Sequence, residues 1–80
     1  MTDEMVLEKL TEIFRDVFFD PGLVARPNMT ASEVERWDSL SHIDMIVLVE
    51  EQFAIRFQTS EVNRMDNVGD LVKLIKAKLG

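Results

Sequence analysis

Ser39 is the residue of this 80-residue chain whose surroundings best suit covalent chemistry. It stands in the sequence Asp38-Ser39-Leu40, where a long segment that holds both prolines gives way to an apolar helical stretch. A phosphate ester on Ser39 would meet the unpaired N–H groups and the positive dipole end of that helix. Aspartate and serine are also ordinary helix N-cap residues, so the tripeptide alone allows a purely structural role as well.

The other residues that could do chemistry lack partners. His42 is the only histidine, and there is no cysteine. No nucleophile is recognisable beside His42, so we expect it to be a surface residue on the first turn of its helix rather than a general base. The Asp66–Asp70 segment lacks the ligand pattern of a calcium loop, and a hydrolase is rejected because no Gly-x-Ser-x-Gly turn occurs. We therefore expect no catalytic residue and no metal site.

Length and charge narrow the function further. Eighty residues predict one domain, residues 1–80, with no room for a core, a substrate cleft and catalytic machinery together. The net charge of −6 disfavours nucleic acid and anionic membranes as partners and favours a protein with a basic docking surface. No stretch approaches the ~18–20 apolar residues of a membrane span. The acidic start Thr2-Asp3-Glu4 is unlike a signal peptide, which predicts a cytoplasmic protein.

Apolar residues at helical spacing predict an all-α bundle with three main helices and one short helix. The predicted helices are 3–18, 39–53, a short one at 59–65, and a last one capped by Asn67. We expect Asp20-Pro21-Gly22 to end the first helix, because the residue before a proline avoids the helical region. The long first loop, residues 19–38, is expected to pack over the helical core, with a short helical turn at 32–35 and Trp37 pinning its end to the core.

The second predicted helix has more apolar residues than one buried stripe can use. One stripe comprises Met45, Ile46, Val49 and Phe53. A second stripe comprises Leu40, Ile43 and Val47, bordered by Asp44, Glu50 and Glu51. If the second stripe is exposed, an apolar surface rimmed by acids is typical of a docking site. If the helix is instead central and buried nearly all round, both stripes belong to the core.

Several segments resemble one known family. The stretch Trp37-Asp38-Ser39-Leu40-Ser41-His42-Ile43-Asp44-Met45-Ile46 resembles the carrier-domain signature of the acyl carrier proteins. Glu50-Glu51-Gln52-Phe53, Ile55-Arg56-Phe57 and Val68-Gly69-Asp70-Leu71 resemble later segments of the same family in the same order. The chain departs from the family at Arg36-Trp37, where many members have a glycine, and at Ser41-His42, where an acidic residue often follows the leucine. The second departure weakens the negative field there and argues against the housekeeping fatty-acid carrier.

The resemblance implies a four-helix carrier bundle that is not itself an enzyme, since carriers of this family are substrates and partners of enzymes. It implies that a phosphopantetheinyl transferase attaches phosphopantetheine to Ser39, with Asp38 as the capping and recognition residue and Leu40 beside it. The thiol of the arm would hold the acyl group as a thioester. The resemblance also implies docking of acyl-loading, condensing or acyl-transfer enzymes by a set of second-helix residues, Leu40, Ile43, Asp44, Val47, Glu50 and Glu51. We expect a monomer.

The cargo stays open at this point. Fatty acyl, polyketide and other specialised acyl groups all fit the pattern, and an aminoacyl or peptidyl carrier is an alternative. A different class of function is an unmodified helical adaptor that uses the second helix only to bind other proteins. The two functions are distinguished by whether a transferase attaches phosphopantetheine from coenzyme A to Ser39, which only the carrier requires.

Overall fold

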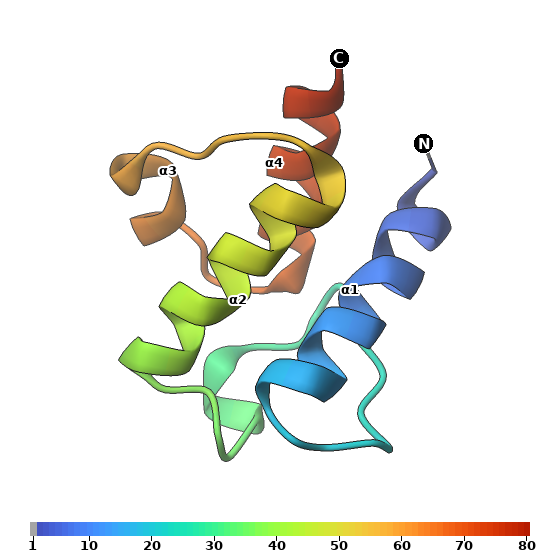
Figure 1. The fold of residues 1–80 in the computed structure, drawn as a ribbon, viewed down its shortest axis with the longest axis vertical. Coiled ribbons are helices and arrows are strands. Elements are labelled where there is room, and N and C mark those ends of the chain that lie inside the picture. The colour runs from blue at the N-terminus through green and yellow to red at the C-terminus, as the bar shows by residue number, and fades with distance from the viewer. Residues whose placement is uncertain (1) are drawn as a thin grey trace.

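A computed structural model describes residues 2–80 and places them in four α-helices and one short 3-10 turn (Figure 1). The elements are α1 (Asp3–Val17), η1 (Ala31–Glu33), α2 (Ser39–Phe53), α3 (Thr59–Asn63) and α4 (Val68–Leu79). No strand occurs within residues 2–80. The all-α class, with three main helices, one short helix and a long first loop, is therefore confirmed.

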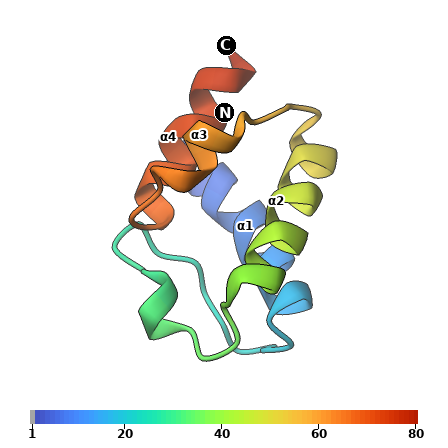
Figure 2. The same ribbon diagram turned by 90° about the vertical axis from the view of Figure 1, so that its left-hand side faces the viewer.

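The core forms where α1 packs against both α2 and α4. The first loop crosses the end of the bundle opposite to the two chain ends (Figures 1 and 2). Phe14 and Phe18 are fully buried, with ring centroids 5.5 Å apart, and α2 and α4 contribute aliphatic side chains around them. The radius of gyration is 11.4 Å, close to the about 12 Å expected of a compact chain of this length.

Helix α1 ends earlier than predicted and for a different reason. Its last residue is Val17, and Phe18 is the C-cap, with its N–H bonded to the Phe14 carbonyl at 2.8 Å. Phe19 then takes a left-handed conformation with a φ of 53°. The helix thus ends upstream of the residue that Pro21 restricts. The prediction placed the end of the helix at Phe18 and attributed it to Asp20-Pro21-Gly22, and both the position, by one residue, and the cause are wrong.

Side chains of α1 hold the first half of the loop. The Thr11 hydroxyl donates to the Leu7 carbonyl at 2.8 Å and accepts from the Ala25 N–H at 3.0 Å. Arg15 Nε donates to the Leu23 carbonyl at 2.7 Å. Leu23, Ala25 and Met29 are buried. The expectation of a loop packed over the core is confirmed, and polar groups on α1 fix its path.

The second half of the loop caps the start of α4. The Val68 N–H donates to the Met29 carbonyl and the Gly69 N–H to the Pro27 carbonyl, both at 2.8 Å. These bonds satisfy N–H groups that a helix leaves free in its first turn. A Cβ on residue 69 would lie 3.0 Å from the Pro27 carbonyl oxygen, so a side chain there would push loop and helix apart by a few tenths of an ångström. Asn67 caps the same turn by accepting from the Asp70 N–H at 2.9 Å, as predicted.

The short elements differ in extent from the prediction. Helix α3 ends at Asn63 instead of residue 65, and the turn in the first loop covers residues 31–33 instead of 32–35. The connector before α3 has no strand and is anchored by a buried Ile55 and a half-buried Phe57, as expected. Among the helices of residues 2–80, none combines the length and apolar character needed to cross a membrane.

Candidate functional site

Ser39 is the first residue of α2 and is exposed. Asp38 is the N-cap: its Oδ1 accepts from the Ser41 N–H at 2.9 Å, and its own N–H donates to Ser41 Oγ at 2.8 Å. The Ser41 hydroxyl also donates to the Arg36 carbonyl at 2.7 Å. Of the two serines in this turn, Ser41 is therefore committed to building the helix start, whereas Ser39 is presented on its surface.

The capping interaction also fixes the charge of Asp38. The hydrogen bond from the Ser41 N–H, and then that from the Ser41 hydroxyl, hold the pKa of the Asp38 carboxyl below its ordinary value. Both bonds favour the ionised form, since a carboxylate accepts them better than a protonated acid does. At neutral pH Asp38 thus places a negative charge immediately before Ser39.

Trp37 and His42 form a second support for this turn. The Trp37 ring lies 5.4 Å from the Phe14 ring and 5.2 Å from the Phe18 ring, which confirms that it pins the loop end to the core. Its indole N–H donates to His42 Nδ1 at 3.0 Å. His42 is consequently half-buried, and burial lowers the pKa of its imidazole. The expectation of a simple surface histidine is wrong, because the sequence does not show that the two rings meet.

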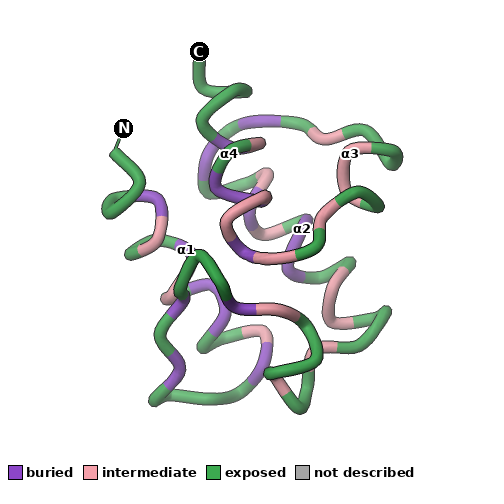
Figure 3. The backbone as a smooth tube through the Cα atoms, turned by 180° about the vertical axis from the view of Figure 1, so that it is seen from behind, coloured by how far each residue is buried: buried purple, intermediate pink, exposed green. Residues whose placement is uncertain are grey.

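Helix α2 has one buried and one exposed apolar face. The buried face is formed by Met45, Ile46, Val49 and Phe53. On the other side, Leu40, Ile43 and Val47 are 75%, 60% and 46% exposed. Figure 3 shows the corresponding alternation of buried and exposed segments along α2. The alternative of a helix buried nearly all round is therefore wrong, and the second stripe lies at the surface.

The acidic residues of α2 separate into two kinds. Asp44 and Glu51 are exposed beside the apolar stripe. Glu50 is half-buried, and its Oε2 accepts from the Phe57 N–H at 2.9 Å. Glu50 thus fastens the connector after α2, where Ala54 turns the chain with a φ of 55°. Sequence reasoning missed this role because Glu50 and Phe57 meet only after the chain has turned.

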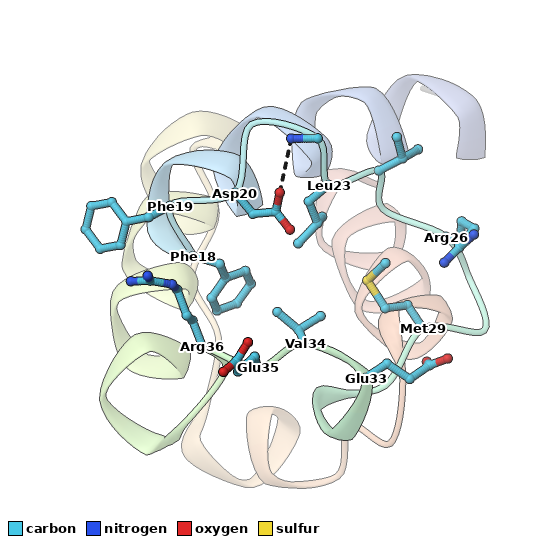
Figure 4. Close-up of a pocket in the computed structure, with 12 residues that line it drawn as sticks. Phe18, Phe19, Asp20, Leu23, Arg26, Met29, Glu33, Val34, Glu35 and Arg36 are labelled. Atoms are coloured by element: carbon cyan, nitrogen blue, oxygen red, sulfur yellow. Dashed lines mark hydrogen bonds between the residues drawn. The ribbon is translucent and has the colours of Figure 1, made fainter.

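Among the described residues, the site around Ser39 includes neither a metal-binding cluster nor the hollow that lies beside the first loop. Within residues 2–80, no group of three or more histidine, aspartate or glutamate side chains is placed to hold a metal ion. A hollow of about 530 Å³ lies between the start of the first loop and residues 33–36 (Figure 4). Its lining mixes apolar side chains with the charged Asp20, Arg26, Glu33, Glu35 and Arg36, and Ser39 is not part of it.

Known proteins resemble this chain in both sequence and fold. No protein-family model matches the chain. An acyl carrier protein of Acidothermus cellulolyticus is 32% identical over 75 residues, which cover 94% of this chain and 89% of that protein. The chain belongs to the acyl carrier protein family. An acyl carrier protein of Clostridium acetobutylicum is 30% identical over 73 residues, covering 91% of this chain and 95% of the relative.

Solved acyl carrier protein structures have the same arrangement of helices. The solution structure of a holo acyl carrier protein from Geobacter metallireducens superposes with a TM-score of 0.85 at 42% identity, covering 91% of this chain and 84% of the other. The crystal structure of an acyl carrier protein from Thermotoga maritima gives a TM-score of 0.84 at 25% identity, covering 96% and 89%. Acyl carrier proteins are carriers and not enzymes, so the role of this chain is that of a carrier.

Proposed function

We propose that Ser39 is the attachment point of a phosphopantetheine arm, on which this acyl carrier protein holds acyl intermediates as thioesters. The observation that carries the proposal is the exposed Ser39 at the first position of α2, directly after the capping Asp38. The holo form of an acyl carrier protein is the form that bears this group, and a holo structure is among the relatives of this chain.

The residues around Ser39 fit a phosphodiester. The first turn of α2 offers N–H groups that have no carbonyl partner within the helix, and its dipole is positive there. The Asp38 carboxylate is engaged with Ser41 and so leaves the Ser39 side chain free. When bound, the arm supplies the thiol that carries the cargo. The chain itself anchors the phosphate, keeps the attachment serine exposed and presents α2 to partner enzymes.

We further propose that the exposed stripe Leu40, Ile43 and Val47, together with Asp44 and Glu51, contacts the enzymes that load and unload the arm. Carboxylates beside an apolar stripe suit partners with basic and apolar patches, and electrostatic steering speeds association without slowing release. Glu50 contributes mainly by holding the connector in place. The partners are a phosphopantetheinyl transferase and acyl-loading, condensing or acyl-transfer enzymes.

The cargo belongs to fatty-acid, polyketide or other specialised acyl biosynthesis, with an aminoacyl or peptidyl group as the alternative. The mass of the loaded protein, purified from its host, identifies it. The single domain over residues 1–80, the monomeric state and the cytoplasmic location stay predictions.

Mass spectrometry tests the modification directly. Apo protein is incubated with coenzyme A and a broad-specificity phosphopantetheinyl transferase, and we expect the mass to increase by one phosphopantetheine. Ser39→Ala should prevent the gain. Ser60→Ala is the control, since it removes an exposed serine of α3, outside the turn that presents Ser39, and should still be modified. No gain in the wild type, or an unchanged gain in Ser39→Ala, would contradict the proposal and leave the unmodified adaptor as the better reading.

A further inference from the structure

A groove of about 430 Å³ runs between the end of α1 and the outer face of α2. Its apolar walls include Val17 and Phe19 from the α1 end and Val47 from α2. Val47 also belongs to the exposed stripe described above, so the groove continues that stripe across to α1. None of the residues predicted from the sequence to dock partners lies on the α1 side.

Phe19 is an unusual residue for its position. Its φ of 53° lies in the left-handed region, where a bulky side chain is disfavoured and glycine is the usual choice. The residue is nevertheless 75% exposed, so it gains little from burial in its own chain. Figure 4 shows Phe18 pointing into the hollow beside the first loop while Phe19 points away from it, with Arg36 nearby. The Arg36 guanidinium lies 5.8 Å from the centre of the Phe19 ring.

The rim of the groove is acidic. Asp16, Asp44 and Glu51 border it, and no lysine, arginine or histidine does. Elsewhere in the structure acidic residues meet lysines: Asp3 is 2.6 Å from Lys76 and Glu61 is 2.9 Å from Lys78. The three carboxylates outnumber the Arg36 guanidinium that lies over the Phe19 ring, so the groove matches a ligand that brings positive charge of its own.

We propose that this groove receives an apolar side chain of an enzyme that acts on Ser39, flanked by lysine or arginine residues that meet Asp16, Asp44 and Glu51. Phe19 is the aromatic anchor of the contact, and its exposure and left-handed backbone serve the complex rather than the free protein. Aromatic residues that become fully desolvated often dominate interface energies. The proposal rests on Ser39 being the attachment site, because it concerns the surface that an enzyme covers on its way to Ser39.

A second copy of this chain is a poorer occupant. Each chain carries a net charge of −6, so two acidic grooves or an acidic helix approaching a groove would repel. Oligomeric state is therefore measured as part of the test.

The test uses Phe19→Gly and the phosphopantetheinyl transferase as the probe, because its reaction is measurable without knowing the cargo. Glycine suits the left-handed backbone, so we expect the melting temperature to stay the same or rise. We expect KM for the carrier to increase about tenfold with kcat unchanged, as when one aromatic anchor is removed from an interface. Met5→Ala removes an exposed apolar side chain from the opposite end of α1 and should leave KM unchanged.

Asp16→Asn probes the charge of the rim outside α2. It should raise KM and reduce the dependence of kcat/KM on salt, whereas Glu4→Gln in the first turn of α1 should change neither. If the wild type is loaded normally and Phe19→Gly has the same KM, the groove is not a docking site, and Ser39 remains the attachment site. A wild-type dimer that dissociates in Phe19→Gly would overturn the enzyme as occupant. A wild type that is never loaded would overturn the function of Ser39, and the groove with it.

Discussion

The indole N–H of Trp37 donates to Nδ1 of His42 at 3.0 Å, and the two rings stack with an interplanar angle of 20°. This contact joins the last part of the first loop to the first turn of α2, three residues after Ser39. It requires a neutral imidazole whose Nδ1 carries no proton. The attachment turn is therefore supported by a bond that depends on pH.

Acid should weaken this support. Burial lowers the pKa of His42 in the folded protein, so the unfolded chain takes up the proton first, around its ordinary pKa of about 6.5. The contribution of the pair is complete above that pH and is lost as the pH falls through the folded-state pKa. The stability advantage of the wild type over His42→Gln should shrink by up to about 1 kcal/mol between pH 7.5 and 5.

Chemical denaturation measures this advantage, and the fluorescence of Trp37 reports on the pair because the chain has one tryptophan and no tyrosine. A difference between the wild type and His42→Gln that does not vary with pH would contradict the prediction. The comparison cancels the titration of the carboxylates, which both proteins share.

The adjacent acids of α2 should respond differently to truncation. Glu50→Ala leaves the Phe57 N–H without its acceptor and should lower the free energy of unfolding by about 1–2 kcal/mol. Glu51→Ala is a surface change and should stay within about 0.5 kcal/mol. Urea denaturation of both variants checks this, and Glu50→Gln should recover most of the loss because an amide oxygen can still accept.

Because Glu50 holds the connector and Glu51 is exposed, only Glu51 of the two is suited to a test of docking. Glu51→Lys should slow loading by the transferase with the fold intact, whereas lysine at position 50 would disturb the connector as well. If Glu51→Lys is loaded as fast as the wild type, Glu51 is a solvated residue without a role in docking.

A side chain at position 69 should destabilise the protein. In Gly69→Ala the new Cβ meets the Pro27 carbonyl oxygen at 3.0 Å and strains the 2.8 Å bond between the Gly69 N–H and that carbonyl. We expect a net loss of about 1–2 kcal/mol, although alanine is the better helix former. Thermal denaturation measures it. Gly22→Ala is the control, since the nearest atom to its Cβ is 3.7 Å away, and a similar loss there would show that crowding at Pro27 is not the cause.

The sequence by itself determined the features that depend on neighbouring residues. The helices follow from apolar spacing, and Asp38 and Asn67 cap them through side chains that reach only three residues along the chain. The position of Ser39 at a helix start is a local property of the same kind. These features could be predicted because the atoms involved are held together by the chain itself.

Only the tertiary structure decided the features that join distant segments. The sequence of α2 has apolar residues on more than one side of the helix. Packing of α1 against α2 decided that the exposed ones are Leu40, Ile43 and Val47. The bond from Val68 to the Met29 carbonyl spans 39 residues, and no local pattern encodes it. The groove beside Phe19 likewise exists only once α1 and α2 lie together, because a surface formed by two elements has no counterpart in the sequence of either.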